Sequence, residues 1–139
     1  MLSISFVIMY AVMFLNIDRT DHLYLSLTRF YMTLLMVAPM AVVMLLMMPM
    51  MYQDKKMNAI IMVSAVAVFG LALFGLRRQA FISEEQYMKA MIPHHSSAIM
   101  VSQHANLTDP EVKKLADQII KAQEKEIAEM KAHLKRLEK

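Results

Sequence analysis

The segment from Met88 to His95 holds residues whose types and spacing suit a metal ion. Met88 and Met91 lie three residues apart, and the adjacent histidines His94 and His95 follow them. On an α-helix this spacing places the side chains on one face. Thioether and imidazole ligands together favour copper or silver, so the segment predicts Ag(I) or Cu(I), the latter in preference to Cu(II). The alternative is an apolar methionine stripe beside a solvent-facing histidine pair.

A second row of candidate ligands lies nearer the C-terminus and contains Gln123, Glu126, Met130 and His133. These residues fall within about 80° of one another on a helical wheel. In an antiparallel pair of helices this row can face the histidine pair. We therefore expect metal ligands from both rows: Met88, Met91, His94, His95, Glu126, Met130 and His133. The alternative is that Met130 is a core residue flanked by boundary residues, with no metal present.

A third methionine pattern lies in a stretch without charges. Its members are Met32, Met36, Met40, Met44, Met47 and Met51. They fall within about 120° of one another on a helical wheel. One interpretation is a thioether relay for Cu(I). The other, which we favour, is adaptable apolar packing, because a methionine-rich helix inside lipid needs no metal.

The elements that position these residues are predicted to be helices, so the expected fold class is all-α. Residues 30–52 carry no charge, and a helix of this length crosses the roughly 30 Å hydrocarbon core of a bilayer. A second apolar run, 57–76, ends in Arg77 and Arg78. The shorter run 2–15 is followed by polar residues and no signal-peptide cleavage site, so it is interpreted as a third span. We expect transmembrane helices at about 1–16, 28–52 and 57–77, within a membrane region of residues 1–80.

Residues 81–139 have a different composition and predict a helical hairpin. Ser83 and Gln86 have the spacing of a capping box. Pro110, preceded by Thr108 and Asp109, indicates a second helix start. We expect antiparallel helices at about 84–105 and 109–137. Because two amphipathic helices bury little surface, we expect a second chain to complete a four-helix bundle, as a homodimer or higher homo-oligomer.

Charge and absent motifs exclude several classes of function. The net charge of +3 comes entirely from residues 1–83, whereas residues 84–139 carry nine basic and nine acidic side chains. A nucleic-acid partner is therefore not expected. The sequence has no E-x-x-H, no G-x-S-x-G and no glycine-rich phosphate loop, so we do not expect an enzyme. The absence of cysteine excludes disulfides and thiolate metal sites.

Residues 91–99, M-I-P-H-H-S-S-A-I, resemble the domain of unknown function 305 family. Residues 109–131 are similar to the family's second signature, A-x-x-I-x-x-x-Q-x-x-E-I-x-x-M, and residues 30–40 resemble its membrane-anchored branch. The resemblance implies a ferritin-like helical bundle that binds copper or silver in some members. By position, it points to Met91, His94, His95 and Met130, with Gln123 and Glu126 as a polar pair. The chain departs from the family pattern at Val101, where a methionine is usual and Met100 stands one residue early.

These observations together predict a membrane-anchored copper- or silver-binding protein that buffers the metal, confers resistance or exchanges the metal with a donor or acceptor protein. Exported relatives favour the bacterial inner membrane with the C-terminal domain outside the cytoplasm. The loop charges lean towards the opposite orientation by a single residue. The alternative function is a membrane scaffold or assembly subunit whose helical pair docks a partner without metal.

Overall fold

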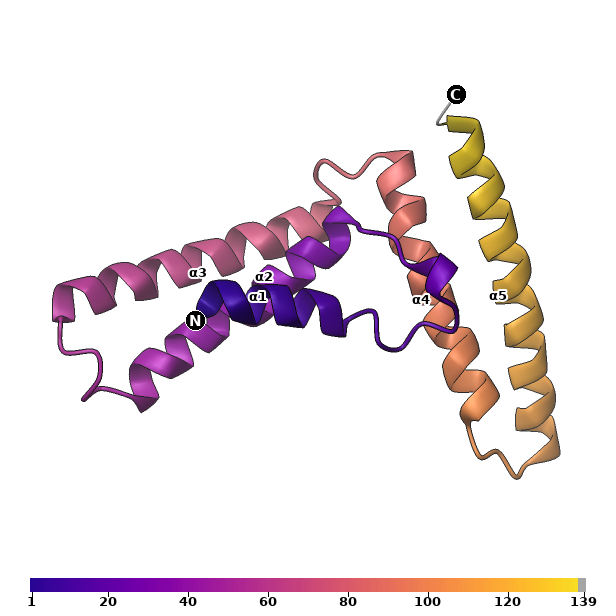
Figure 1. Cartoon of the computed structure of the whole chain (residues 1–139), viewed down its shortest axis with the longest axis horizontal. Coiled ribbons are helices and arrows are strands. Elements are labelled where there is room, and N and C mark those ends of the chain that lie inside the picture. Colours follow the sequence, from indigo (N-terminus) through magenta and orange to yellow (C-terminus); the bar gives the residue numbers. More distant parts are fainter. Residues whose placement is uncertain (138–139) are drawn as a thin grey trace. The chain divides into compact units, whose positions relative to one another are not determined.

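The structure is a computed structural model that describes residues 1–137 of the chain. Its helices are α1 (Leu2–Val12), the short 3-10 helix η1 (Thr20–His22), α2 (Leu27–Met47), α3 (Lys55–Arg78), α4 (Glu84–His104) and α5 (Pro110–Leu137) (Figure 1). No strand occurs in the described part, so the predicted all-α class is confirmed. The chain forms two compact units. The first contains Met1–Val12 and Leu27–Phe81, and the second contains Met13–Ser26 and the residues from Ile82 onward.

Helices α2 and α3 of the first unit could cross a membrane by length and composition. They contain 21 and 24 residues, which correspond to about 32 and 36 Å of helix. Helix α2 ends at Met47, short of the expected residue 52, because Pro49 disfavours helix at the preceding residue. Helix α3 begins at Lys55, two residues before the expected residue 57, because Asp54 Oδ1 accepts hydrogen bonds from the backbone N–H groups of Lys56 and Met57.

The expected third membrane span over residues 1–16 is wrong. Helix α1 has 11 residues, about 16 Å, which is half the thickness of a hydrocarbon core. The chain turns at residues 13–16, and from Met13 it belongs to the second unit. Helix α1 therefore ends before it reaches spanning length.

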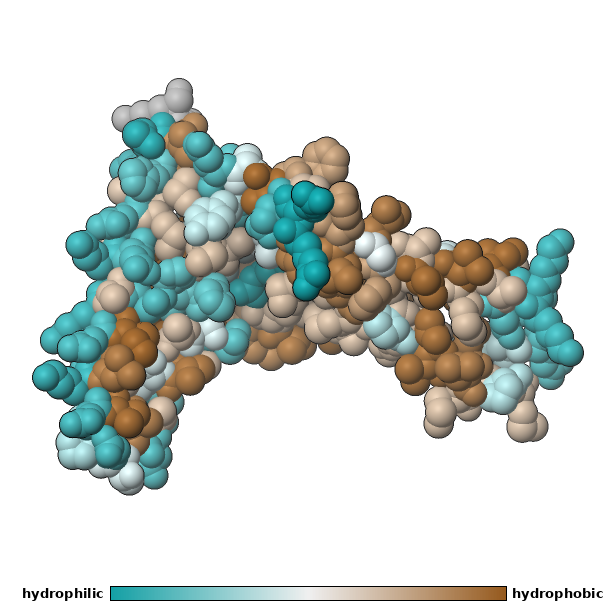
Figure 2. Space-filling view, turned by 180° about the vertical axis from the view of Figure 1, so that it is seen from behind, coloured by the Kyte–Doolittle hydropathy of each residue, from teal (hydrophilic) through white to brown (hydrophobic). Residues whose placement is uncertain are grey.

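Small side chains bring α2 and α3 close together as an antiparallel pair (Figure 1). Ala38 and Ala41 of α2 and Ala65 and Ala72 of α3 are buried, a composition typical of membrane helix contacts. At Gly75 an added Cβ would lie 3.0 Å from the ring of Tyr31, so any larger residue there would require the ring to shift by a few tenths of an ångström. Large apolar side chains of this unit face outwards, and Figure 2 shows hydrophobic surface over it.

Helices α4 and α5 of the second unit form the expected antiparallel hairpin (Figure 1). Their starts follow the sequence signals: Ser83 Oγ accepts from Gln86 N–H, and Asp109 Oδ1 accepts from Glu111 and Val112 N–H. The core between them consists of Met88, Ile92, Ile99, Ile127 and Leu134, with Tyr24, Ile120 and Met130 packed against it. That this pair is half of a ferritin-like bundle completed by a second chain stays a prediction.

The segment 13–26 packs on one side of the hairpin and supplies Tyr24 to its core. Another part of the hairpin is uncovered. Val101 at the end of α4 and Val112, Leu115 and Ile119 at the start of α5 are exposed. Figure 2 shows a hydrophobic patch at the turn end of the hairpin. Part of the apolar surface of this unit therefore remains exposed to solvent in a single chain.

Candidate metal site on the α4–α5 hairpin

His95 is the predicted ligand that makes the most specific contacts. Its Nδ1 lies 2.9 Å from the carbonyl oxygen of Met91, one turn earlier on α4. Its Nε2 lies 2.8 Å from Glu126 Oε2 on α5, with the imidazole side chain 11% exposed and the carboxylate side chain 51% exposed. Because a carbonyl only accepts, Nδ1 carries hydrogen and donates it. Nε2 then meets Glu126 either as a second N–H donor or, when deprotonated, as a nitrogen lone pair available to a metal ion.

His94 lies beside this pair and is exposed to solvent. Its ring centroid is 6.0 Å from that of His95, and the two ring planes meet at 77°. The imidazole of His95 is therefore held in place by its contacts, whereas that of His94 is exposed to solvent beside it. His133, the third expected imidazole, is exposed on α5, and no described contact joins it to His95.

The four thioether and carboxylate candidates have different environments. Met88 is a buried member of the hairpin core, and Met130 packs against that core, as the packing alternative predicted for Met130. Met91 is half-buried, whereas Glu126 faces solvent and His95. Among residues 1–137 no three imidazole, thiol or carboxylate side chains gather closely enough to hold an ion together. A site here would therefore have to include thioethers.

The two serines that follow the histidine pair bind a different part of the unit. Ser96 Oγ accepts a hydrogen bond of 2.8 Å from the backbone N–H of Asp18 and lies 2.9 Å from His22 Nδ1. Ser97 Oγ accepts one of 2.7 Å from the side-chain amide of Asn16. Ser96 is completely buried. The serine pair therefore fastens segment 13–26 to α4.

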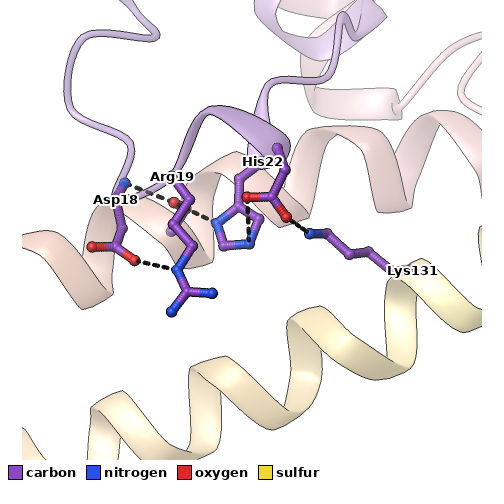
Figure 3. Close-up of polar contacts among 6 residues, drawn as sticks. Asp18, Arg19, His22 and Lys131 are labelled. Carbon is purple, nitrogen blue, oxygen red and sulfur yellow. Dashed lines mark hydrogen bonds and ion pairs between the residues drawn. The ribbon is translucent and has the colours of Figure 1, made fainter.

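Charged side chains surround this attachment (Figure 3). Lys131 Nζ of α5 lies 2.5 Å from Asp21 Oδ2, and that hydrogen bond lowers the pKa of Asp21. His22 is 6% exposed. Burial lowers the pKa of His22, and the nearby positive charge of Lys131 lowers it further, against the opposing effect of Asp21. Figure 3 shows the His22 ring between the backbone of segment 13–26 and the Lys131 side chain.

Ser96, His22 and Asp21 have the residue types of a hydrolase triad but not its geometry. The hydroxyl of Ser96 is sealed from solvent and already accepts the Asp18 N–H. His22 Nε2 lies 3.8 Å from Asp21 Oδ1, beyond hydrogen-bond distance. A substrate cannot reach this hydroxyl, so the cluster is structural.

Comparison with known proteins places the chain in a family. Residues 36–134 match the sequence profile of the domain of unknown function DUF305. The chain belongs to the DUF305 family. An uncharacterized protein of Acanthamoeba polyphaga mimivirus is 41% identical to it over 112 residues, which are 79% of this chain and 72% of the viral protein. No solved structure matches the chain.

In this DUF305 chain the sequence M-I-P-H-H-S-S (Met91–Ser97) has contacts of two kinds. Its histidines are directed to α5 and solvent, and its serines are directed to segment 13–26. The sequence prediction included neither His22 nor the serine contacts. The available signal was the polar cluster Asn16 to His22 between two apolar runs, which needs polar partners wherever it is buried.

Proposed function

We propose that this DUF305 chain is a membrane-anchored protein that binds Cu(I) or Ag(I) through the α4–α5 hairpin. The observation that carries the proposal is the contact of His95 with both Met91 and Glu126, which orients an imidazole nitrogen towards a carboxylate on the facing helix. His95 and His94 supply imidazole ligands. Glu126 and the thioethers of Met91 and Met130 complete the donor set. His133 is a further imidazole ligand on α5, and Met88 packs in the hairpin core beneath the site.

The chemistry of the donors supports a soft ion. Imidazole and thioether ligands suit Cu(I) and Ag(I), whereas Ca²⁺ and Mg²⁺ need several oxygens. The backbone hydrogen bond at Nδ1 is the arrangement found behind many metal-bound histidines, where it selects Nε2 as the ligand. Glu126 then serves either as an oxygen ligand or as the partner that holds the imidazole.

The cellular role that follows is metal buffering, resistance or delivery to a partner protein. We place the chain in the bacterial inner membrane, anchored by α2 and α3, with the hairpin outside the cytoplasm. An oxidising compartment suits a donor set that contains no thiol.

We also propose a homo-oligomer, because the exposed residues Val112, Leu115 and Ile119 form an apolar stripe on α5. Light scattering of the detergent-solubilised chain tests this, and a single-chain mass would overturn it.

A second candidate function has its own supporting observation. Met88 and Met130 pack in or against the hairpin core, and an apolar patch lies exposed near the α4–α5 turn. Both features suit a membrane scaffold whose hairpin docks another protein without metal. The two functions differ in one measurable property, the dependence of hairpin stability on Ag(I) or Cu(I).

The test is thermal unfolding of the purified full chain in detergent, with and without Ag(I) in chloride-free buffer. At about 100 times its dissociation constant, a bound ion adds about 2.7 kcal/mol to the free energy of unfolding. The His94→Ala, His95→Ala double variant should lose this gain. The matched control is His104→Ala, because His104 Nδ1 makes the same 2.9 Å contact with a carbonyl one turn earlier but has no ion-pair partner among the described residues.

An upward shift of the midpoint that survives in His104→Ala and disappears in the double variant supports the metal function. An equal shift in all three proteins overturns the assignment of the site. No shift, together with no metal by elemental analysis, favours the scaffold function instead.

A further inference from the structure

The connection between α2 and α3 carries an unusual density of exposed thioethers. Met47, Met48, Met50 and Met51 are 75%, 38%, 88% and 63% exposed, respectively. They occupy four of the five consecutive positions 47–51, and Pro49 is the fifth. Neither the hairpin site nor the packing of α2 on α3 uses these side chains, since α2 contacts α3 through its alanines.

Backbone hydrogen bonds hold this connection as a compact turn. Met48 N–H donates to the carbonyl oxygen of Met44 at 3.1 Å, which continues the winding of α2 by one residue. The carbonyl oxygen of Met48 then accepts from the N–H groups of Met51 and Tyr52, at 3.1 and 3.3 Å. The chain therefore folds back on Met48, and the methionines on either side of Pro49 belong to one turn.

The turn differs from the rest of the methionine row in α2. Met32 and Met36 are each 41% exposed and lie one turn apart on α2, about 6 Å in rise. The turn holds four methionines within five consecutive residues, whereas residues 32–36 of α2 hold two. Polar residues 53–56 follow it directly, so an ion in water can reach these sulfurs at the end of the apolar span.

The carboxylate closest in sequence to this turn already has a structural role. The nearest carboxylate in sequence, Asp54, accepts hydrogen bonds from the N–H groups of Lys56 and Met57 as the N-cap of α3. The positive charges of Lys55 and Lys56 repel divalent ions from the same region more strongly than monovalent ones. Neutral thioethers bind soft monovalent ions in preference to hard divalent ones.

We propose that the α2–α3 turn is a second soft-metal site, at which the thioethers of Met47, Met48, Met50 and Met51 bind Cu(I) or Ag(I) without imidazole. This extends the proposed metal function to a different set of ligands and does not depend on the hairpin site. A thioether has no proton to lose in this pH range, so binding at the turn is independent of pH. Binding at the hairpin weakens as its imidazoles become protonated.

The experiment measures Ag(I) retained by the full chain in detergent, by elemental analysis after gel filtration in nitrate buffer. At about pH 4.5, where ordinary imidazoles are protonated, wild type should retain about one Ag(I) per chain. The variant Met47→Leu, Met48→Leu, Met50→Leu, Met51→Leu keeps the apolar character and removes the sulfurs, and should retain none. Its matched control is Met32→Leu, Met36→Leu, which replaces two partly exposed methionines within α2 and should retain the ion.

The outcomes separate the two sites. Wild type without Ag(I) at the acidic pH, or a quadruple variant that retains it, overturns the turn site. Loss of the ion from the Met32→Leu, Met36→Leu control also overturns it, because the row along α2 would then be the ligand. Acid-stable Ag(I) in the His94→Ala, His95→Ala variant supports the turn site. If neutral binding also survives unchanged in that double variant, the hairpin site is wrong and the turn site stands.

Discussion

The histidine pair and the serine pair of α4 differ in how completely their polar atoms are hydrogen-bonded and shielded from solvent. Ser96 is buried, and its hydroxyl contacts both the Asp18 N–H and His22 Nδ1. His95 keeps part of its surface open, and its Nε2 meets a carboxylate that is itself half-exposed. His94, on the same side, faces solvent. One helix therefore presents a closed polar contact on one side and an accessible one on the other.

The difference indicates what each pair contributes. A buried hydroxyl with its partners in place stabilises a tertiary contact, and losing it leaves those partners unsatisfied. A partly exposed imidazole beside an exposed carboxylate contributes little to folding, because solvent screens the pair. It is, however, available to an ion. We therefore expect substitutions on the serine side to change stability and substitutions on the histidine side to change binding.

The largest effect on stability is expected from Ser96→Ala. It removes the acceptor of the Asp18 N–H and the partner of His22 Nδ1 inside the protein, which should cost about 1–3 kcal/mol of unfolding free energy. Thermal unfolding and faster hydrogen exchange of the Asp18 amide measure this. Ser97→Ala is the control, since its contact with Asn16 is exposed and should be worth less than about 1 kcal/mol. Unchanged Asp18 exchange in Ser96→Ala would contradict the role of the serine side.

The next effect concerns affinity rather than stability. Glu126→Gln keeps the shape of the side chain but removes the charge opposite His95 Nε2. Loss of such a partner lowers metal affinity by about tenfold or more, while unfolding without metal should change by less than about 1 kcal/mol. A competition titration with Ag(I) measures the affinity. If the variant unfolds as readily as Ser96→Ala and binds Ag(I) as wild type does, the two sides of α4 do not differ as described.

A smaller effect is expected from pH, because protonation of His22 alters one contact of Ser96 rather than both. Burial lowers the pKa of His22 below its ordinary value of 6.5. The unfolded chain therefore binds more protons than the folded chain between the two pKa values. The free energy of unfolding should be largest above pH 6.5 and fall as the pH drops through 6.5 towards the folded pKa.

His22→Gln should remove this slope, as measured by unfolding midpoints between about pH 7.5 and 5.5. The lowered pKa of Asp21 affects stability in a separate pH range. Its contribution to the free energy of unfolding is lost only as the pH falls below 3.8. A slope between pH 7.5 and 5.5 that persists in His22→Gln would assign the effect to another histidine.

Local signals determined much of the helical structure from the sequence alone. Ser83 and Asp109 cap α4 and α5 as their spacing indicates, because a cap depends on residues within one turn. The uncharged runs identified α2 and α3, since span length and hydropathy are properties of a single segment. The facing of Glu126 and the histidine pair also followed from helical periodicity and the short turn between the helices.

Only the tertiary structure decided which polar residues are enclosed. Segment 13–26 packs against α4 through contacts that join residues 74 to 81 positions apart, and no local pattern encodes such a pairing. The same packing buries His22, and α1 ends at Val12, where the sequence predicted a membrane span to residue 16. Burial likewise separates Met88, in the hairpin core, from the exposed methionines of the α2–α3 turn. Identical side chains acquire different roles because solvent access depends on the assembled chain rather than on residue type.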